Sequence, residues 1–149
     1  MMYAKIINGA LTKFPYTIEE MQAENPDATI AEEPTDEELA ACNAKRATMG
    51  PNPTQSSRTH TFEPSFTPNE DGSVTIVFIA HELDRQLAEL NMRDARDSAL
   101  TRCDWVITRA FEEGNPVPAN YLAYRNALRD LPSQPGFPYD YVWPVLSTD

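Results

Sequence analysis

The sequence predicts an α+β protein with strands in its first half and helices in its second. Two patterns support this: an Asn8-Gly9 turn between two apolar runs, and a change from strand-like to helix-like periodicity at Glu82. The length of 149 residues suits one domain with a real core. We expect an N-terminal β-hairpin with a short helix, a central strand pair, an antiparallel two-helix hairpin and an extended proline-rich C-terminal strap.

The N-terminal hairpin follows from the Asn-Gly dipeptide, because both central residues of its tight turn need a positive φ. The predicted hairpin runs from Tyr3 to Phe14 and pairs these two residues at its open end. After Pro15, Thr17 with Glu20 three residues later forms a capping-box pattern. A short helix is therefore expected, ending near Asn25-Pro26.

A second helix is predicted from a cap at Thr35 or Asp36 through Ala47, with acidic residues at its start and basic residues at its end. The Pro/Ser/Thr-rich residues that follow resemble a connector. We therefore divide the chain into residues 1–47 for the N-terminal hairpin and helices, 48–60 for a linker, and 61–149 for the strand pair, helical hairpin and strap.

The central strand is predicted over Ser73–Ala80, which is apolar on both alternating faces and so resembles a strand covered on both sides. The segment with Phe62 and Phe66 is expected to form its antiparallel partner. Pro64 and Pro68 would keep that partner at a sheet edge, since proline cannot donate to a ladder.

Helical spacing begins after Glu82. The apolar stripe predicts one helix of roughly 25 to 30 residues with at most a slight break, ending at Gly114. The stripe consists of Leu83, Leu87, Leu90, Ala99, Cys103, Val106 and Ala110. A second helix is expected over about Ala119–Leu131, antiparallel to the first because the connection is short. Leu122, Leu128 and Leu131 are expected to face inward.

The strap, residues 133–149, carries four aromatic residues at a spacing of two, which an extended chain would present on one side. Together with two tyrosines of the second helix, they are the candidate partner-binding residues: Tyr121, Tyr124, Phe137, Tyr139, Tyr141 and Trp143. Two interpretations stay open. The strap is either an intramolecular latch, which the short distance from the helix end favours, or an arm for a partner.

One polar pair and one tryptophan are expected between the two long helices. Asp104 is predicted to pair with Arg125 or Arg129, fastening the helices to each other. Trp105 is either a core residue or a binding anchor, and we favour the core.

Composition excludes several functions. Twelve Lys/Arg against 23 Asp/Glu give a net charge of −11, with no basic segment, so we expect no nucleic-acid binding. The sequence shows no apolar run long enough for a membrane span. Cys42 and Cys103 are expected to be reduced thiols.

Enzymatic chemistry is not expected either. The adjacent glutamates diverge, no Gly-rich phosphate loop is present, and His60 and His81 have no third ligand at metal spacing. We therefore expect no catalytic residues, no metal and no cofactor.

Two separated segments resemble the tail fibre assembly and tail assembly chaperone-like proteins of tailed bacteriophages. The N-terminal segment is "YAKIINGALTKFPYTIEEMQAENPDATI". The C-terminal one combines "RDARDSALTRCDWVITRA" with "YRNALRDLPSQPGFPYDYVWP". The middle of the chain, with its acidic run over residues 32–38, departs from this pattern.

The resemblance implies a non-enzymatic protein that binds a phage tail fibre or baseplate protein. One alternative is an assembly chaperone that shields the fibre during trimerisation in the host cytoplasm and then leaves. The other is a permanent component retained in the virion tail. In both, the partner sets the oligomeric state. A remote third alternative is an acidic regulator that imitates nucleic acid.

Overall fold

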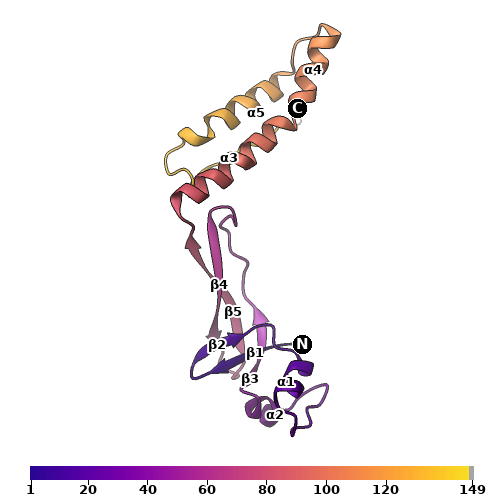
Figure 1. The fold of residues 1–149 in the computed structure, drawn as a ribbon, viewed down its shortest axis with the longest axis vertical. Coiled ribbons are helices and arrows are strands. Elements are labelled where there is room, and N and C mark those ends of the chain that lie inside the picture. The colour runs from indigo at the N-terminus through magenta and orange to yellow at the C-terminus, as the bar shows by residue number, and fades with distance from the viewer. Residues whose placement is uncertain (148–149) are drawn as a thin grey trace. The chain divides into compact units, whose positions relative to one another are not determined.

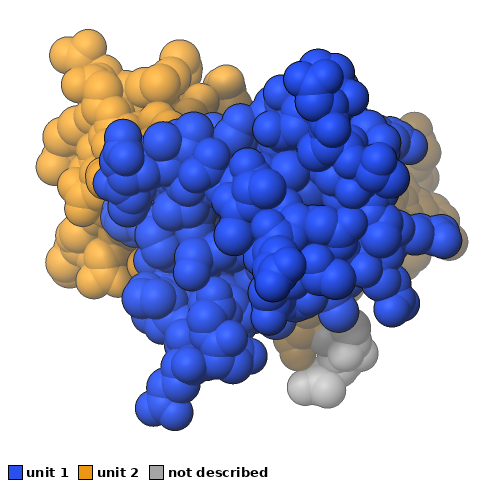
Figure 2. Space-filling model, turned by 90° about the horizontal axis from the view of Figure 1, so that it is seen from below, with its two compact units in different colours: residues 1–54, 62–80 blue, residues 55–61, 81–149 orange. Residues whose placement is uncertain are grey.

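The computed structural model describes residues 1–147 and confirms the α+β class. The chain forms two compact units, which are coloured separately in Figure 2. The N-terminal unit comprises residues 1–54 and 62–80. The C-terminal unit comprises residues 55–61 and the chain from residue 81 onward.

A five-stranded mixed sheet forms the framework of the N-terminal unit, and its strand order is β2-β1-β3-β5-β4. β1 is antiparallel to both of its neighbours, whereas β3 and β5 are parallel. The strands are β1 (Met2–Ile7), β2 (Ala10–Lys13), β3 (Ala44–Met49), β4 (His60–Pro68) and β5 (Val74–Glu82).

The predicted N-terminal hairpin is confirmed as β1 and β2 (Figure 1). Asn8 and Gly9 take φ values of 52° and 78°, as the tight turn requires. The predicted pairing of Tyr3 with Phe14 is wrong, because the register shifts beyond the turn and Lys5 lies opposite Lys13. The Thr12 hydroxyl in this irregular stretch donates to the Lys5 carbonyl at 3.1 Å.

The two short helices each begin with a capping box. α1 (Ile18–Glu24) is capped by Thr17 with Glu20, as predicted, and α2 (Asp36–Ala41) is capped by Thr35 with Glu38. The prediction that the second helix extends to Ala47 is wrong. The helix ends at Ala41, Asn43 adopts a φ of 53°, and β3 begins at Ala44.

This helix ends early because the next residues pair with two strands. β3 forms a ladder with β1 on one side and with β5 on the other. Ala44 and Ala47 become buried on its two faces, one in each core cluster of the unit. Tertiary pairing therefore overrides the helical preference of the alanines.

Buried side chains cover both faces of the sheet. On one face the helices contribute Met21 and Leu39 to a cluster with Tyr3 and Tyr16. On the other face Ala4 packs in a cluster that contains no helix residues. Its other members and their partly buried neighbours are Ala47, Val74, Ile76, Ile6, Leu11, Phe14, Phe66 and Phe78. Alternation along β1 places Tyr3 and Ala4 in different clusters, as strand geometry requires.

The predicted central strand pair is confirmed as β4 and β5, with β4 at the edge of the sheet, as its prolines require. The expectation that β5 is covered on both sides holds only for its first half. Val74 and Ile76 are fully buried, but Ile79 is 48% exposed.

The C-terminal unit contains three helices, α3 (Arg85–Thr101), α4 (Asp104–Glu113) and α5 (Ala119–Asp130). α5 lies beside α3 in Figure 1, and the two helices are in contact. The single long helix that the apolar stripe predicts is interrupted after Thr101. The break is larger than expected, since α4 leaves in a different direction in Figure 1.

The predicted inward face of the second helix is partly correct. Leu128 and Leu131 are fully buried, but Leu122 is 45% exposed and its prediction is wrong. At about 100° per residue, Leu122 lies roughly 120° around α5 from Leu128. It therefore points away from the side that packs.

The extended strap is not formed as predicted. After a 3₁₀ turn, η1 (Leu131–Ser133), the chain continues in turns through Asp140. The amides of Tyr139 and Asp140 both donate to the Gly136 carbonyl at 3.0 Å. Gly136 has a φ of 85°, and a Cβ there would lie 3.0 Å from the Asp140 carbonyl oxygen, so the turn requires glycine.

Candidate partner-binding surface

The C-terminal segment places its predicted partner-binding residues against the helices of its own unit. Phe137 is only 6% exposed and forms a core cluster with Met92 of α3 and Leu131. Tyr141 and Trp143 pack against this cluster, with their rings edge to face and 6.4 Å between centroids. The first aromatic side chain is thus buried, and the last two are partly covered.

Polar contacts fasten the same segment. The Tyr139 hydroxyl donates to the Leu83 carbonyl at 2.6 Å, and Arg85 donates to the Phe137 carbonyl at 3.2 Å. The Gln134 side chain accepts from the Val142 amide at 2.7 Å and donates to the Val142 carbonyl at 2.9 Å. The Gln134 side chain thereby satisfies both backbone polar groups of Val142. These contacts are those of an intramolecular fastening.

The two tyrosines of α5 are partly buried. Tyr121 and Tyr124 lie on the same side of the helix as buried Leu128, because their spacings of three and four return to one face. Each retains some exposure. They are therefore less accessible than the sequence prediction required of binding anchors.

Two aromatic residues that the sequence did not assign to binding are the ones most open to solvent. Trp105 is 58% exposed and Phe111 is 88% exposed, and both lie on α4. Among the described residues they are the only aromatic ones with such large exposed apolar side chains. We call them the α4 aromatic pair. The prediction that Trp105 lies in the core is wrong.

The helical wheel of α4 explains this exposure. Val106 and Ala110 are each 6% exposed and define the side of α4 that packs. At about 100° per residue, Trp105 and Phe111 project from the opposite side, roughly 60° to either side of its centre. This signal was present in the sequence: one small apolar stripe already occupied the inner face, which left no room there for Trp105.

The structure brings together one of the two expected polar pairs. Arg125 of α5 donates to the Asp104 carboxylate of α4 at 2.8 Å. Arg129 instead donates to Asn126 on its own helix at 3.2 Å. Arg125 also donates to the Leu100 carbonyl at 2.9 Å, a contact that sequence reasoning missed.

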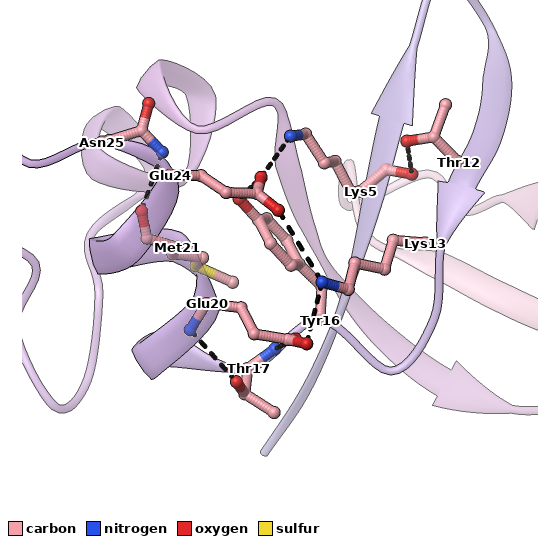
Figure 3. Close-up of polar contacts among 9 residues, drawn as sticks. All are labelled: Lys5, Thr12, Lys13, Tyr16, Thr17, Glu20, Met21, Glu24 and Asn25. Carbon is pink, nitrogen blue, oxygen red and sulfur yellow. Dashed lines mark hydrogen bonds and ion pairs between the residues drawn. The ribbon is translucent and has the colours of Figure 1, made fainter.

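The N-terminal unit has a dense polar cluster around Tyr16, shown in Figure 3. The Tyr16 hydroxyl donates to Glu24 at 2.8 Å, and the ammonium groups of Lys5 and Lys13 lie 5.3 and 5.7 Å from the centre of its ring. Lys5 pairs with Glu24, and Lys13 pairs with Glu20 at 2.8 Å. Each charge in this cluster has a partner within it, which is typical of a structural corner.

The pKa values in this corner follow from the contacts. Burial, followed by the hydrogen bond to Glu24, raises the pKa of Tyr16, so the phenol is neutral at ordinary pH. Hydrogen bonds from Lys5 and then Tyr16 lower the pKa of Glu24, which keeps this carboxylate ionised. A neutral phenol donating to a fixed carboxylate has no poised proton for catalysis.

Over residues 1–147, no group of three or more His, Cys, Asp or Glu side chains is arranged to hold a metal ion. Both thiols, Cys42 and Cys103, are buried and unbridged. None of the helices in the described part of the chain has the length and apolar character needed to cross a membrane.

Comparison with known proteins gives one match. Residues 89–146 match the family model described as phage tail assembly chaperone protein. No curated protein and no solved structure matches the chain. The matched residues include most of α3, all of α4 and α5, and the fastened C-terminal segment. The resemblance predicted from the C-terminal segment of the sequence is therefore confirmed as a match of residues 89–146 to the phage tail assembly chaperone protein family.

Proposed function

We propose that this chain is a non-enzymatic phage tail assembly chaperone that binds the tail fibre protein in the host cytoplasm. The observation that carries the proposal is the exposure of the α4 aromatic pair within the segment that matches the family. Trp and Tyr or Phe side chains dominate binding hot spots, and a folded protein seldom leaves two such side chains open without a use.

Charge explains how such a surface stays soluble before a partner covers it. The chain carries a net charge of −11, which opposes self-association. On α4 itself, Arg109 lies one turn after Trp105 and pairs with Glu113 at 2.8 Å, which places a polar border on the Trp105 side of the helix. An apolar centre with a polar rim is the usual composition of a protein–protein interface.

The fastened C-terminal segment has a different role in this proposal. With Phe137 in the core and Tyr139, Tyr141 and Trp143 partly covered, it acts as the latch of the helical unit. Partner binding is assigned to α4, where Trp105 and Phe111 are 58% and 88% exposed. The proposed binding site is therefore on α4 instead of the strap.

Co-expression with the tail fibre protein of the same phage tests the function. The wild-type chain should raise the yield of soluble, trimeric fibre and co-purify with it. Replacement of Trp105 and Phe111 by Ser should abolish both effects. The matched control replaces Leu87 and Leu90 of α3, which are 45% and 55% exposed, by Ser. If the control and the α4 variant lose activity equally, the assignment to α4 is wrong.

Mass spectrometry of purified phage particles separates a chaperone from a permanent tail component. A chaperone should be absent from particles that contain the fibre. Stoichiometric presence of the chain in mature particles would instead support the alternative, an adaptor that remains bound to fibre or baseplate.

A further inference from the structure

The break between α3 and α4 needs a cause, because the apolar stripe of the sequence continues across it. In an uninterrupted α-helix the Leu100 carbonyl would accept from the Asp104 amide, four residues later. Here it accepts from the Cys103 amide at 3.0 Å, which tightens the last turn of α3. The same carbonyl accepts a second hydrogen bond, from Arg125 of α5, at 2.9 Å.

One guanidinium therefore contacts both sides of the break. Nη1 of Arg125 reaches the Leu100 carbonyl in the last turn of α3 and, at 2.8 Å, the carboxylate of Asp104, the first residue of α4. The Arg125 side chain is 12% exposed, whereas that of Asp104 is 58% exposed. Hydrogen bonds from a shielded guanidinium are stronger than those between neutral groups in water.

Local residues assist the break without setting its direction. The Thr101 hydroxyl donates to the Asp97 carbonyl at 3.0 Å, and the Cys103 thiol donates to the Ala99 carbonyl at 3.3 Å. Such bonds to the preceding turn favour bending of a helix. These bonds all lie within one segment of chain, whereas the hydrogen bonds of Arg125 connect the break to a second helix, α5.

We propose that Arg125 is a positioning residue that fixes the direction of α4 and thereby presents the α4 aromatic pair to its partner. The effect on binding rests on the function proposed above, whereas the effect on the direction of α4 does not. Arg129, four residues later on the same helix, is a natural control, since its hydrogen bond goes to Asn126 of its own helix.

Pulsed electron–electron spin resonance measures the direction of α4 in the full chain. Spin labels on Asp94→Cys in α3 and Glu112→Cys in α4 use two exposed sites. The native thiols are buried and should label slowly. We expect one narrow distance distribution for the labelled parent and for Arg129→Met. Arg125→Met should broaden or shift it, and Arg125→Lys should fall between, because lysine keeps the charge but not the planar fork.

The milder variant Asp104→Asn guards against loss of folding. It keeps the Leu100 contact and removes only the ion pair, so a partly broadened distribution is expected. If Arg125→Met folds and its distances equal those of the parent, the inference is wrong. If Arg125→Met does not fold, unchanged distances in both Asp104→Asn and Arg125→Lys lead to the same conclusion.

Binding of the tail fibre protein provides the second readout. Arg125→Met should weaken it by roughly tenfold or more while leaving Trp105 and Phe111 intact. If the distances change but fibre binding does not, the claim that Arg125 presents the α4 aromatic pair to its partner is wrong. If Trp105→Ser/Phe111→Ser binds normally, the proposed function fails at α4, and the distance measurement still decides the role of Arg125 in the fold.

Discussion

The Tyr16 corner of the N-terminal unit and helix α4 of the C-terminal unit expose their aromatic residues to very different degrees. In the N-terminal unit Tyr16 is 1% exposed, hydrogen-bonded to Glu24 and enclosed by two lysines. In the C-terminal unit Trp105 and Phe111 are 58% and 88% exposed. The same class of side chain thus completes a closed corner in one unit and forms an open surface in the other.

This difference indicates which aromatic residues can serve binding without contributing to the stability of the fold. Every polar group around Tyr16 has a partner, so a change there removes stability. α4 packs through small residues, Val106 and Ala110, and its large side chains are free to contact something else. We therefore expect variants of the corner to change stability and variants of the α4 surface to change binding.

The largest stability difference should separate two phenylalanines of the C-terminal unit. Phe137→Ala removes a side chain that is 6% exposed, whereas Phe111→Ala removes one that is 88% exposed. We expect the first to lower the free energy of unfolding by about 3 to 5 kcal/mol, because it leaves a cavity beside Met92. The second should change it by less than about 0.5 kcal/mol. Urea unfolding of both variants provides the measurement.

That matched pair also tests the C-terminal segment as a latch. If Phe137→Ala unfolds at the same urea concentration as the parent, the segment does not stabilise the helical unit. The sequence hypothesis of a free binding arm would then regain support.

A smaller loss is expected at the Tyr16 corner. Tyr16→Phe removes the 2.8 Å hydrogen bond to Glu24 and should cost about 1 kcal/mol. The raised pKa of Tyr16 adds a pH dependence: its stabilisation is complete below the ordinary value of 10.0 and is lost as pH rises toward the folded-state value. Thermal melting above about pH 10 should therefore fall more steeply for the parent than for Tyr16→Phe.

Tyr124→Phe is the control for this prediction, since no hydrogen bond of its hydroxyl occurs among the described residues. Equal losses in the two variants at neutral pH would mean that the Glu24 contact contributes nothing to stability.

The smallest effect on stability is expected from Glu24 at acidic pH. The pKa of Glu24 lies below its ordinary value of 4.5, chiefly because Lys5 and then Tyr16 donate to it. Its contribution is therefore present above 4.5 and is lost as pH falls through the lower folded-state value. Between about pH 6 and pH 3, Glu24→Gln should lose less melting temperature than the parent. If the melting temperatures of the two proteins fall in parallel with pH, the Glu24 carboxylate does not contribute to stability.

Local signals in the sequence predicted much of the fold. Asn8-Gly9 specified the first turn, Thr17 with Glu20 specified the start of α1, and the prolines of β4 specified a sheet edge. Each of these signals acts within a few residues. They therefore need no knowledge of the rest of the molecule.

The sequence predictions fail where contacts with residues far away along the chain determine the local structure. The alanines after Ala41 favour a helix until β1 and β5 pair with β3. The stripe through Cys103 favours one long helix, but the helix is interrupted where the Leu100 carbonyl accepts from the Cys103 amide and from Arg125. The strap was predicted as extended because the alternation of its aromatic residues was visible and the Gly136 turn was not.

The partner-binding residues predicted from the sequence and the site proposed on α4 lie in the same unit but on different segments. The pairing of Asp104 with Arg125 was among the expected contacts, and the structure places these side chains together. Phe111 received no role because an exposed aromatic residue has no periodic signature of its own. Its exposure follows only from knowing which face of α4 packs.

Isothermal titration calorimetry of the full chain with the purified tail fibre protein tests the central claim most directly. We predict that replacing Trp105 and Phe111 by Ala weakens binding by roughly 30-fold or more, as expected for hot-spot residues, while the melting temperature stays close to that of the parent. Replacing the exposed Leu87 and Leu90 by Ala should change the affinity only slightly. Equal affinity of the α4 variant and the parent, measured on folded proteins, would contradict the account.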